Sequence, residues 1–340
     1  AAIVDLKAAV RYLKANDKAM PGDAKKIISN GTSAGGAMSA LLGATADQKD
    51  YEKYLKALGA ADGSDKVFAV SAYCPITDLD HADMAYEWQF NGVNDYKKMN
   101  ISMLDYRVKR ELVAGTLTDD EKKLSDLLKP LYPAYLNSLN LKSPEGKPLT
   151  LDAQGNGSFK NHITGLLAQS AQTQLDAGKD LSDRTWLTVR NGKVVSVDFD
   201  AYAKAAGRQK TPPAFDGVDL SAGENQLFGT NTVDKRHFTA FSMQHNTAAN
   251  AEIADEETIK IMNPLNYIGK PGVSLPQNWR IRVGTNDRDT SLAVSAVLAA
   301  KLQNNGQTVD YALPWDVGHG GDYDLDELFA WMNQVSRSAK

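Results

Sequence analysis

The feature that most constrains the fold of this chain is a short β-branched run that leads into a glycine-rich turn and then into small residues. Residues 26–30, Lys-Ile-Ile-Ser-Asn, have the composition of a strand. The pattern G-x-S-x-G follows as Gly31-Thr32-Ser33-Ala34-Gly35, and the next run, Gly36-Ala37-Met38-Ser39-Ala40-Leu41-Leu42, is typical of a helix. A strand, a sharp turn and a helix in this order predict a nucleophile elbow, which presents a serine hydroxyl at a helix N-terminus.

The elbow gives each of its residues an expected role. Ser33 is the candidate nucleophile, held in strained backbone geometry by the sharp turn. The N–H group of Ala34 opens the helix without an intrahelical acceptor, so we expect it to hold a developing oxyanion. Gly31 and Gly35 are expected to be required, because a Cβ at either position would strike the neighbouring strand or helix. The alternative interpretation is a glycine-rich turn before a helix, with no catalytic role.

Composition excludes several classes of function. The chain has 340 residues, of which 42% are hydrophobic and 24% are charged, with a net charge of −4. These values are those of an ordinary globular protein with one large domain or two moderate ones. No apolar run reaches the ~20 residues that span a bilayer, and Lys and Arg form no basic stripe, so we expect neither a membrane nor a nucleic acid as partner. The single cysteine, Cys74, excludes a disulfide framework and a multi-cysteine metal site, and we interpret it as a buried packing residue.

The first residues predict a helix rather than a strand. Ile3, Leu6, Val10 and Leu13 recur at helical spacing, which leaves room for one helix and one strand before Ser33. A nucleophile elbow normally follows several strands of its sheet. We therefore expect the first strands and the second oxyanion donor to come from an N-terminal segment of the same protein, either covalently joined or as a separate chain.

Strands and helices alternate at both ends of the sequence. The expected strands are residues 26–30, 66–72, 279–284 and 309–315. The expected helices toward the C-terminus are 292–302 and 324–335, the first of them capped by Thr290-Ser291. The apolar face of the last helix is expected to carry Leu325, Leu328, Phe329 and Met332. This alternation predicts a parallel sheet covered by helices.

About two hundred residues separate the second and third expected strands, which is far too long for a connection. We interpret them as an inserted domain: residues 1–77 and 264–340 form the two parts of the sheet domain, and 78–263 form the insertion. The insertion has signals of its own, a capping box over 118–121 and a type I′ hairpin turn at Asn191-Gly192. Insertions over the C-terminal edge of such a sheet commonly grip the ligand, so we interpret this one as a lid.

A serine nucleophile needs a base, and the base needs a carboxylate that orients it. In the α/β-hydrolase fold the acid and then the histidine follow the serine, each in a loop after a strand. Asp287 follows the expected strand at 279–284, and His319 follows the last strand among several glycines. Asp289 could exchange roles with Asp287, but it abuts the next helix, where aspartate is a common cap. The sequence therefore predicts a triad of Ser33, Asp287 and His319.

With these residues in place, the chain resembles the bacterial tannases, which are α/β-hydrolases with a large lid. The resemblance extends over almost the whole sequence. It rests on Gly31-Thr32-Ser33-Ala34-Gly35-Gly36, Ala72-Tyr73-Cys74-Pro75-Ile76-Thr77-Asp78-Leu79, Tyr86-Glu87-Trp88-Gln89-Phe90-Asn91-Gly92, Gly284-Thr285-Asn286-Asp287-Arg288-Asp289-Thr290 and Gly318-His319-Gly320-Gly321. It implies the same triad and the hydrolysis of galloyl ester and depside bonds in hydrolysable tannins and simple gallate esters, releasing gallic acid without a metal or cofactor.

The resemblance also implies a set of residues that recognises the galloyl ring, namely Lys210, Glu224 and Asp289. A galloyl ring carries three adjacent hydroxyl groups, and each costs free energy if it is buried without a partner. A carboxylate accepts from two neighbouring hydroxyls, and a lysine ammonium donates to a third. A pocket of this kind rejects rings that lack the hydroxyl groups.

Two alternatives remain open from the sequence. In the first alternative, the chain is a feruloyl-type or general aromatic carboxylesterase with the same triad. In the second, it is a noncatalytic fragment that is inactive until a separate N-terminal piece joins it. The relative rates on gallate and ferulate esters distinguish the first alternative, and an activity assay with and without such a piece distinguishes the second.

Overall fold

The structure is a computed structural model that describes residues 2–104 and 106–338. The chain divides into two compact units. Unit 1 contains the residues up to Asp78, Lys260–Gly284 and the residues from Ser295 onward, whereas unit 2 contains Leu79–Ile259 and Thr285–Val294. The segment Thr285–Val294 is one that the sequence analysis assigns to the sheet domain. Among the described residues, no helix is long and apolar enough to cross a membrane.

Unit 1 is built on a parallel sheet, as predicted. Its strands, in their order across the sheet, are β1 (Ile28–Thr32), β2 (Ala69–Tyr73), β7 (Asn278–Arg282) and β8 (Thr308–Ala312). The three neighbouring pairs are all parallel, and their registers align the last residues of the four strands. The loops that follow the strands therefore leave the sheet at one edge, which is where sheets of this kind place their ligand sites.

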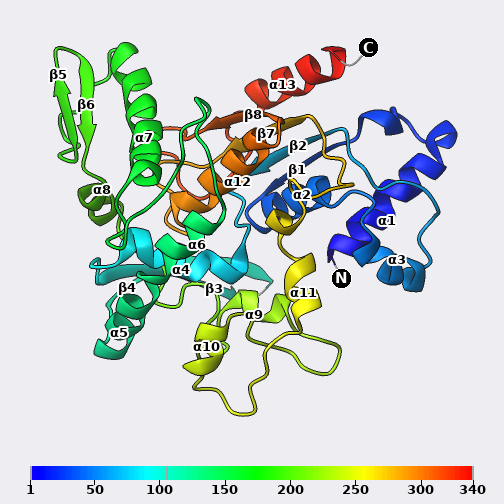
Figure 1. Cartoon of the computed structure of the whole chain (residues 1–340), viewed down its shortest axis with the longest axis horizontal. Helices are drawn as coiled ribbons and strands as arrows, with labels where there is room; N and C mark the ends of the chain where they lie inside the picture. Colours follow the sequence, from blue (N-terminus) through cyan, green and yellow to red (C-terminus); the bar gives the residue numbers. More distant parts are fainter. Residues whose placement is uncertain (1, 105, 339–340) are drawn as a thin grey trace. The chain divides into compact units, whose positions relative to one another are not determined.

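Helices cover both faces of this sheet (Figure 1). On one face lies α2 (Ala34–Ala44), which packs so closely that a Cβ on Gly43 would lie 2.4 Å from Val70 and 2.9 Å from Trp279. On the other face lies α13 (Leu325–Ser338). The other helices that contribute to unit 1 are α1 (Ala2–Ala15), α3 (Glu52–Leu58) and most of α12 (Leu292–Asn304).

The buried face of α13 differs from the predicted one. The buried residues of this helix are Leu328, Trp331 and Val335. Leu325 and Phe329, which were predicted to face the core, are 45% and 56% exposed. The carboxylate of Asp324, just before the helix, accepts hydrogen bonds from Arg280 and Tyr73 of the sheet, and this anchor fixes the rotation of the helix. The indole of Trp331 is therefore buried in place of the phenyl ring of Phe329, and an indole supplies more buried apolar area than a phenyl ring.

The helix α1 buries a charged side chain as well as apolar ones. Lys7 is fully buried, and its Nζ donates to Asp65 at 2.9 Å and to the carbonyl oxygen of Thr45 at 2.6 Å. Leu6, one of the four apolar residues that recur at helical spacing, is 39% exposed. Burial lowers the pKa of Lys7, and the paired carboxylate opposes that shift. The ammonium is tolerated there because its donors have acceptors.

Unit 2 is mainly helical, with two hairpins. Its helices are α4 (Leu79–Phe90), α5 (Asp119–Leu128), α6 (Leu131–Ser138), α7 (Ser158–Asp176), α8 (Phe199–Ala206), α9 (Gly223–Leu227), α10 (Ala240–Gln244) and α11 (Glu256–Ile261), the last of which ends in unit 1. Its hairpins are β3 (Asp95–Leu104) with β4 (Arg107–Thr116), and β5 (Leu187–Arg190) with β6 (Lys193–Val197). Two sequence signals are confirmed. Thr118 and Glu121 form the capping box of α5, and Asn191 and Gly192 have φ values of 51° and 72°, the positive pair that a type I′ turn requires.

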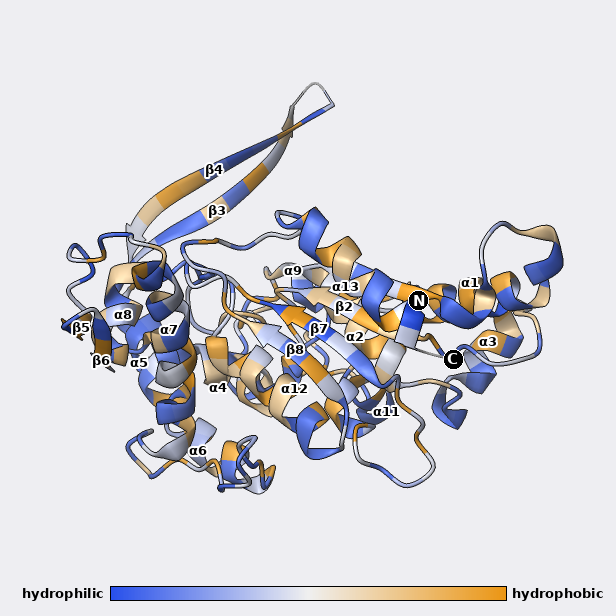
Figure 2. Cartoon of the chain, turned by 90° about the horizontal axis from the view of Figure 1, so that it is seen from above, coloured by the Kyte–Doolittle hydropathy of each residue, from blue (hydrophilic) through white to orange (hydrophobic). Residues whose placement is uncertain are grey.

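The sequence analysis does not predict the β3–β4 hairpin, which extends as a long two-stranded ribbon (Figure 2). Nearly all side chains of β4 are exposed, whichever face of the ribbon they lie on. Met99, Ile101 and Met103 of β3 are exposed as well. A strand with no buried face lacks the strict alternation of polar and apolar residues by which strands are recognised.

Candidate active site

The turn between β1 and α2 has the geometry of a nucleophile elbow. Ser33 has φ 59° and ψ −116°, a backbone conformation that costs about 1–3 kcal/mol in a residue other than glycine. Its N–H donates to the carbonyl oxygen of Tyr73 at 3.0 Å, which ties the strained turn to the end of β2. Ala34 is the first residue of α2, so its N–H has no acceptor within the helix.

The glycines of the elbow are required at two positions, one of which differs from the prediction. A Cβ on Gly31 would lie 2.2 Å from the carbonyl oxygen of Gly35, as expected. A Cβ on Gly35 itself would meet no atom within 4 Å, so the expectation that this residue must be glycine is wrong. Gly36 is the second crowded position, because its Cβ would lie 2.5 Å from the carbonyl oxygen of Tyr73. Gly35 contributes its backbone atoms to the crowding over Gly31, whereas a Cβ on Gly35 would point into open space.

The loop after β8 brings His319 to the elbow. The Nε2 atom of His319 lies 2.7 Å from Oγ of Ser33, although 286 positions separate the two residues. Close backbone contacts hold this loop. A Cβ on Gly321 would lie 2.1 Å from Oγ1 of Thr32, and a Cβ on Gly284 would lie 1.9 Å from the carbonyl oxygen of Val317. Glycine in both positions lets the loops after β7 and β8 approach each other and the elbow.

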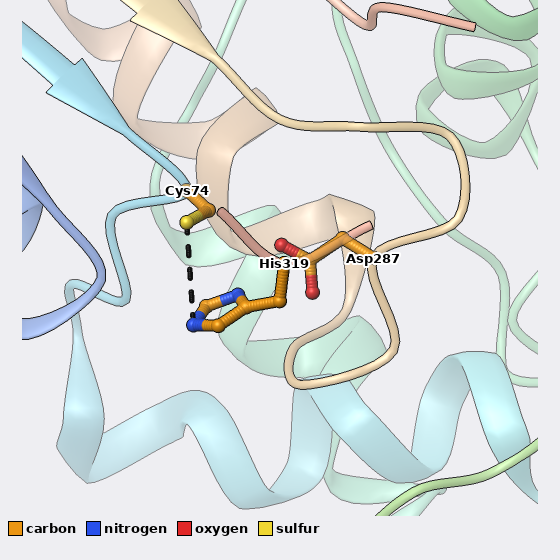
Figure 3. A group of neighbouring side chains, drawn as sticks. All are labelled: Cys74, Asp287 and His319. Carbon is orange, nitrogen blue, oxygen red and sulfur yellow. Dashed lines mark hydrogen bonds between the residues drawn. The ribbon is translucent and has the colours of Figure 1, made fainter. Parts of the chain in front are cut away.

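Cys74 lies beside the same imidazole (Figure 3). It is buried, as predicted, and has a positive φ of 37° at the end of β2. Its Sγ lies 4.0 Å from Nε2 of His319 and 3.4 Å from the carbonyl oxygen of Gly320, to which the thiol donates. Ser33 Oγ is much closer to the ring nitrogen, so the hydroxyl, and not the thiol, is the group placed for proton transfer.

A buried polar cluster supports the end of β2 beneath the elbow. Arg280 donates to Oη of Tyr73 at 2.9 Å, and both side chains bond to the carboxylate of Asp324. Burial, together with this carboxylate, raises the pKa of Tyr73 to about 12. Burial opposes ionisation of Asp324, but the hydrogen bonds from Tyr73 and Arg280 outweigh it and leave its pKa below the ordinary value. The cluster fixes the strand whose last carbonyl group receives the N–H of Ser33.

The candidate acids lie in the segment that continues from β7 into unit 2. Figure 3 shows Asp287 in the loop that follows this strand. Asp287 is buried, and its Oδ1 accepts a hydrogen bond from the N–H of Asp289 at 2.9 Å. Ser291 accepts from the N–H of Ala293 at 3.1 Å and caps α12, as predicted. The alternative role of Asp289 as the cap of this helix is therefore filled by Ser291.

The residues implied for galloyl recognition all belong to unit 2. Lys210 lies in the loop after α8, with its Nζ 4.1 Å from the centroid of the Phe215 ring. Glu224 lies in the short helix α9. The next residue, Asn225, is fully buried and donates to Asp216 at 2.8 Å, which fixes the backbone beside Glu224. Sequence reasoning did not identify the polar residues that hold these segments.

Comparisons with known proteins agree with this geometry. The family model BD-FAE, which describes an α/β-hydrolase family, matches residues 1–118. A search of curated proteins found no match. Similar solved structures include a tannase from Lactobacillus plantarum, which is 47% identical with a TM-score of 0.95 over 98% of this chain and 71% of that one. A tannase from Fusobacterium nucleatum is 52% identical, with a TM-score of 0.93 over 98% of this chain and 73% of that one. A tannin acyl hydrolase in complex with ethyl gallate is 47% identical, with a TM-score of 0.91 over 98% of this chain and 70% of that one.

The parallel sheet, the elbow at Ser33 and the matching family model define an α/β-hydrolase. The solved structures that are 47% and 52% identical over 98% of the chain narrow this class, and the chain belongs to the bacterial tannase family. The predicted resemblance is thereby confirmed. Tannin acyl hydrolases are carboxylic ester hydrolases, and this chain is an enzyme of that class.

Proposed function

We propose that this chain hydrolyses galloyl ester and depside bonds in hydrolysable tannins and simple gallate esters, and that it releases gallic acid through acyl transfer to Ser33. The observation that carries the proposal is the 2.7 Å separation between Ser33 Oγ and His319 Nε2 at a strained elbow. Family membership supports the substrate class, since a related tannin acyl hydrolase was solved with ethyl gallate and another with 3,4-dihydroxybenzoate.

The proposed reaction proceeds in two steps. His319 Nε2 takes the proton of Ser33 as Oγ attacks the galloyl carbonyl carbon, and the N–H of Ala34 stabilises the oxyanion that forms. The imidazolium then protonates the departing alcohol, which leaves a galloyl ester on Ser33. Water, deprotonated by the same imidazole, attacks this ester, and the collapse of the second oxyanion returns the proton to Ser33 and releases gallic acid.

We assign Asp287 as the carboxylate that orients the imidazole and stabilises its protonated form. It is buried, and it comes three residues after Gly284, whose backbone closely approaches that of Val317, two residues before His319. A buried carboxylate holds the ring in the tautomer that leaves Nε2 free to accept the serine proton. The Oδ1 atom of Asp287 also accepts from the N–H of Asp289, which restrains the side chain.

The proposal assigns Lys210, Glu224 and Asp289 to the three phenolic hydroxyl groups of the galloyl ring. All three belong to unit 2, which we propose acts as the substrate-recognition lid. The carboxylates accept from adjacent hydroxyl groups, and the lysine donates to a phenolic oxygen and favours its ionisation. A ferulate ring has one hydroxyl and one methoxy group, so it leaves part of the recognition set without a hydrogen-bond partner. Buried polar groups without a partner reduce the rate of ferulate ester hydrolysis.

A comparison of kcat/KM for two ester substrates tests the proposed substrate class. We expect kcat/KM for methyl gallate to exceed that for methyl ferulate by about 10²-fold or more, the selectivity of a site that must pair every buried hydroxyl group. The matched variants Lys210→Ala and Glu224→Ala are expected to reduce methyl gallate hydrolysis more than methyl ferulate hydrolysis. Equal rates on the two esters in the wild-type protein would instead favour a general aromatic carboxylesterase.

A further inference from the structure

The structure fixes Lys210 far more firmly than a solvated surface charge requires. Its N–H donates to Oη of Tyr86 at 3.0 Å, and its carbonyl oxygen accepts from the guanidinium of Arg208 at 3.2 Å. Its ammonium group lies over the ring of Phe215, 4.1 Å from the centroid. Both backbone groups and the charged end of this residue therefore have defined partners.

One face of α4 supplies the groups that hold this segment. Asp83, Tyr86 and Glu87 share that face because they are three and four residues apart in the helix. Asp83 Oδ1 accepts from the N–H of Phe215 at 2.6 Å. Glu87 pairs with the guanidinium of Arg208, at 2.9 Å between Oε2 and Nη1, and both side chains are fully buried. The helix thus fixes both ends of the segment that carries Lys210.

The hydroxyl group of Tyr86 joins this segment to a second one. It accepts from the N–H groups of Gln209 at 3.1 Å and Lys210 at 3.0 Å, and it donates to the carbonyl oxygen of Arg288 at 2.8 Å. A hydroxyl group has one donor and two acceptor positions, so all three are used. Arg288 lies between Asp287 and Asp289 in the sequence. Burial raises the pKa of Tyr86, which keeps the hydroxyl protonated as the donor to Arg288.

We propose that Tyr86 is a positioning residue that sets the spacing between Lys210 and Asp289, and thereby selects the galloyl ring. This inference rests on the proposed function. Tyr86 acts through the backbone N–H of Lys210 and the carbonyl oxygen of Arg288, the residue before Asp289. The same hydroxyl group connects the segment that carries Lys210 to the segment that carries Asp289, so a shift of one segment is transmitted to the other through a single atom.

Replacement of Tyr86 by phenylalanine isolates the hydroxyl group. The ring contacts remain, with centroids 4.6 Å from Phe90 and 6.3 Å from Phe215, so the variant keeps its packing. Two N–H groups and one carbonyl group lose their partner in a buried setting, and the two segments separate to recover hydrogen bonds. A displacement of about 1 Å in a positioning group costs up to about 10²-fold in rate.

The test compares methyl gallate with p-nitrophenyl acetate, which has no phenolic hydroxyl to recognise, in the whole chain. For Tyr86→Phe we expect KM for methyl gallate to rise about 10- to 100-fold, and kcat/KM for methyl gallate to fall at least about 10-fold further than kcat/KM for p-nitrophenyl acetate. The matched control is Tyr311→Phe, which removes the hydroxyl group of a half-buried tyrosine, 2.7 Å from Ser295 Oγ in unit 1. It is expected to leave the ratio of the two activities unchanged. Arg208→Lys keeps the charge beside Glu87 but loses the fork that reaches Lys210, and it should raise KM for methyl gallate in the same direction.

An unchanged KM for methyl gallate in folded Tyr86→Phe would overturn the positioning role. Lys210→Ala separates this failure from that of the proposed function. If Lys210→Ala raises KM for methyl gallate and Tyr86→Phe does not, gallate recognition stands and the proposal for Tyr86 is wrong. If Lys210→Ala has no effect either, the recognition set itself is wrong, and the positioning role is overturned with it.

Discussion

A Cβ placed on Gly284 would lie 1.9 Å from the carbonyl oxygen of Val317. The first residue belongs to the loop after β7 and the second to the loop that carries His319. Their backbones are in contact, so any side chain at position 284 would displace the loop that carries the imidazole. The position of His319 relative to Ser33 thus depends on the glycine at the start of the loop after β7.

Gly284→Ala is accordingly expected to displace the histidine loop. Overpacking of this kind costs about 1–3 kcal/mol of stability, and displacement of the imidazole should reduce kcat for methyl gallate by about 10-fold or more. Gly318→Ala is the matched control, because a Cβ there meets nothing within 4 Å. Thermal unfolding and kcat, measured for both variants, check the prediction. Equal effects of the two substitutions would show that the contact at Val317 is unimportant.

The elbow provides a second matched pair. Gly36→Ala would place a Cβ 2.5 Å from the carbonyl oxygen of Tyr73 and should destabilise the protein by about 1–3 kcal/mol. Gly35→Ala meets no neighbour within 4 Å, and alanine favours a helix over glycine by up to about 1 kcal/mol, so this variant should be as stable as the wild type or slightly more stable. The free energy of unfolding in urea, measured for both variants, tests this prediction. A greater loss of stability in Gly35→Ala than in Gly36→Ala would contradict it.

A pH dependence is expected from Asp83 of α4. Burial, with the nearby charge of Asp216, raises the pKa of Asp83 to about 8. The same carboxyl group titrates near pH 4 in an unfolded chain, so between about pH 4 and 8 the folded protein binds more protons than the unfolded chain. The stability that Asp83 contributes is therefore fully present below about pH 4 and is lost as the pH rises toward 8.

Urea unfolding at pH 5 and pH 8 measures this effect. Between pH 5 and pH 8, the free energy of unfolding of the wild-type protein should fall by about 1–3 kcal/mol more than that of Asp83→Asn, since asparagine does not titrate. An identical pH dependence in the two proteins would mean that Asp83 is ionised throughout the range.

Much of the fold was predictable from sequence because local signals and the final structure agree. The elbow, the parallel strands, the capping box of α5 and the Asn191-Gly192 turn each depend on a short run of residues with one favoured geometry. Ser33 and His319, which lie 2.7 Å apart, could be singled out as candidates because the order of nucleophile, acid and base is tied to the strands of this sheet.

The remaining features depend on contacts that a sequence does not reveal. Phe329 and Trp331 are both aromatic, and the sequence does not reveal the contacts, among them those of Asp324 with Arg280 and Tyr73, that accompany the burial of Trp331. The requirement for glycine at position 36 rather than 35 depends on the carbonyl group of Tyr73, which belongs to another strand.

The groups that hold Lys210 escaped prediction for the same reason. Tyr86 and Glu87 lie more than a hundred positions before the segment they bind. The sequence analysis quotes them within the motif of residues 86–92 that carries the family resemblance, but it assigns neither residue a role. Their role is visible only once α4 and the loop after α8 are placed side by side.

The most direct test of the central claim is kcat/KM for methyl gallate in Ser33→Ala. Acyl transfer through the Ser33 hydroxyl and the His319 imidazole predicts a loss of about 10⁴- to 10⁶-fold, as when the nucleophile of a serine hydrolase is removed. A Ser33→Ala protein that retained methyl gallate hydrolysis within 10-fold of the wild type would contradict the account.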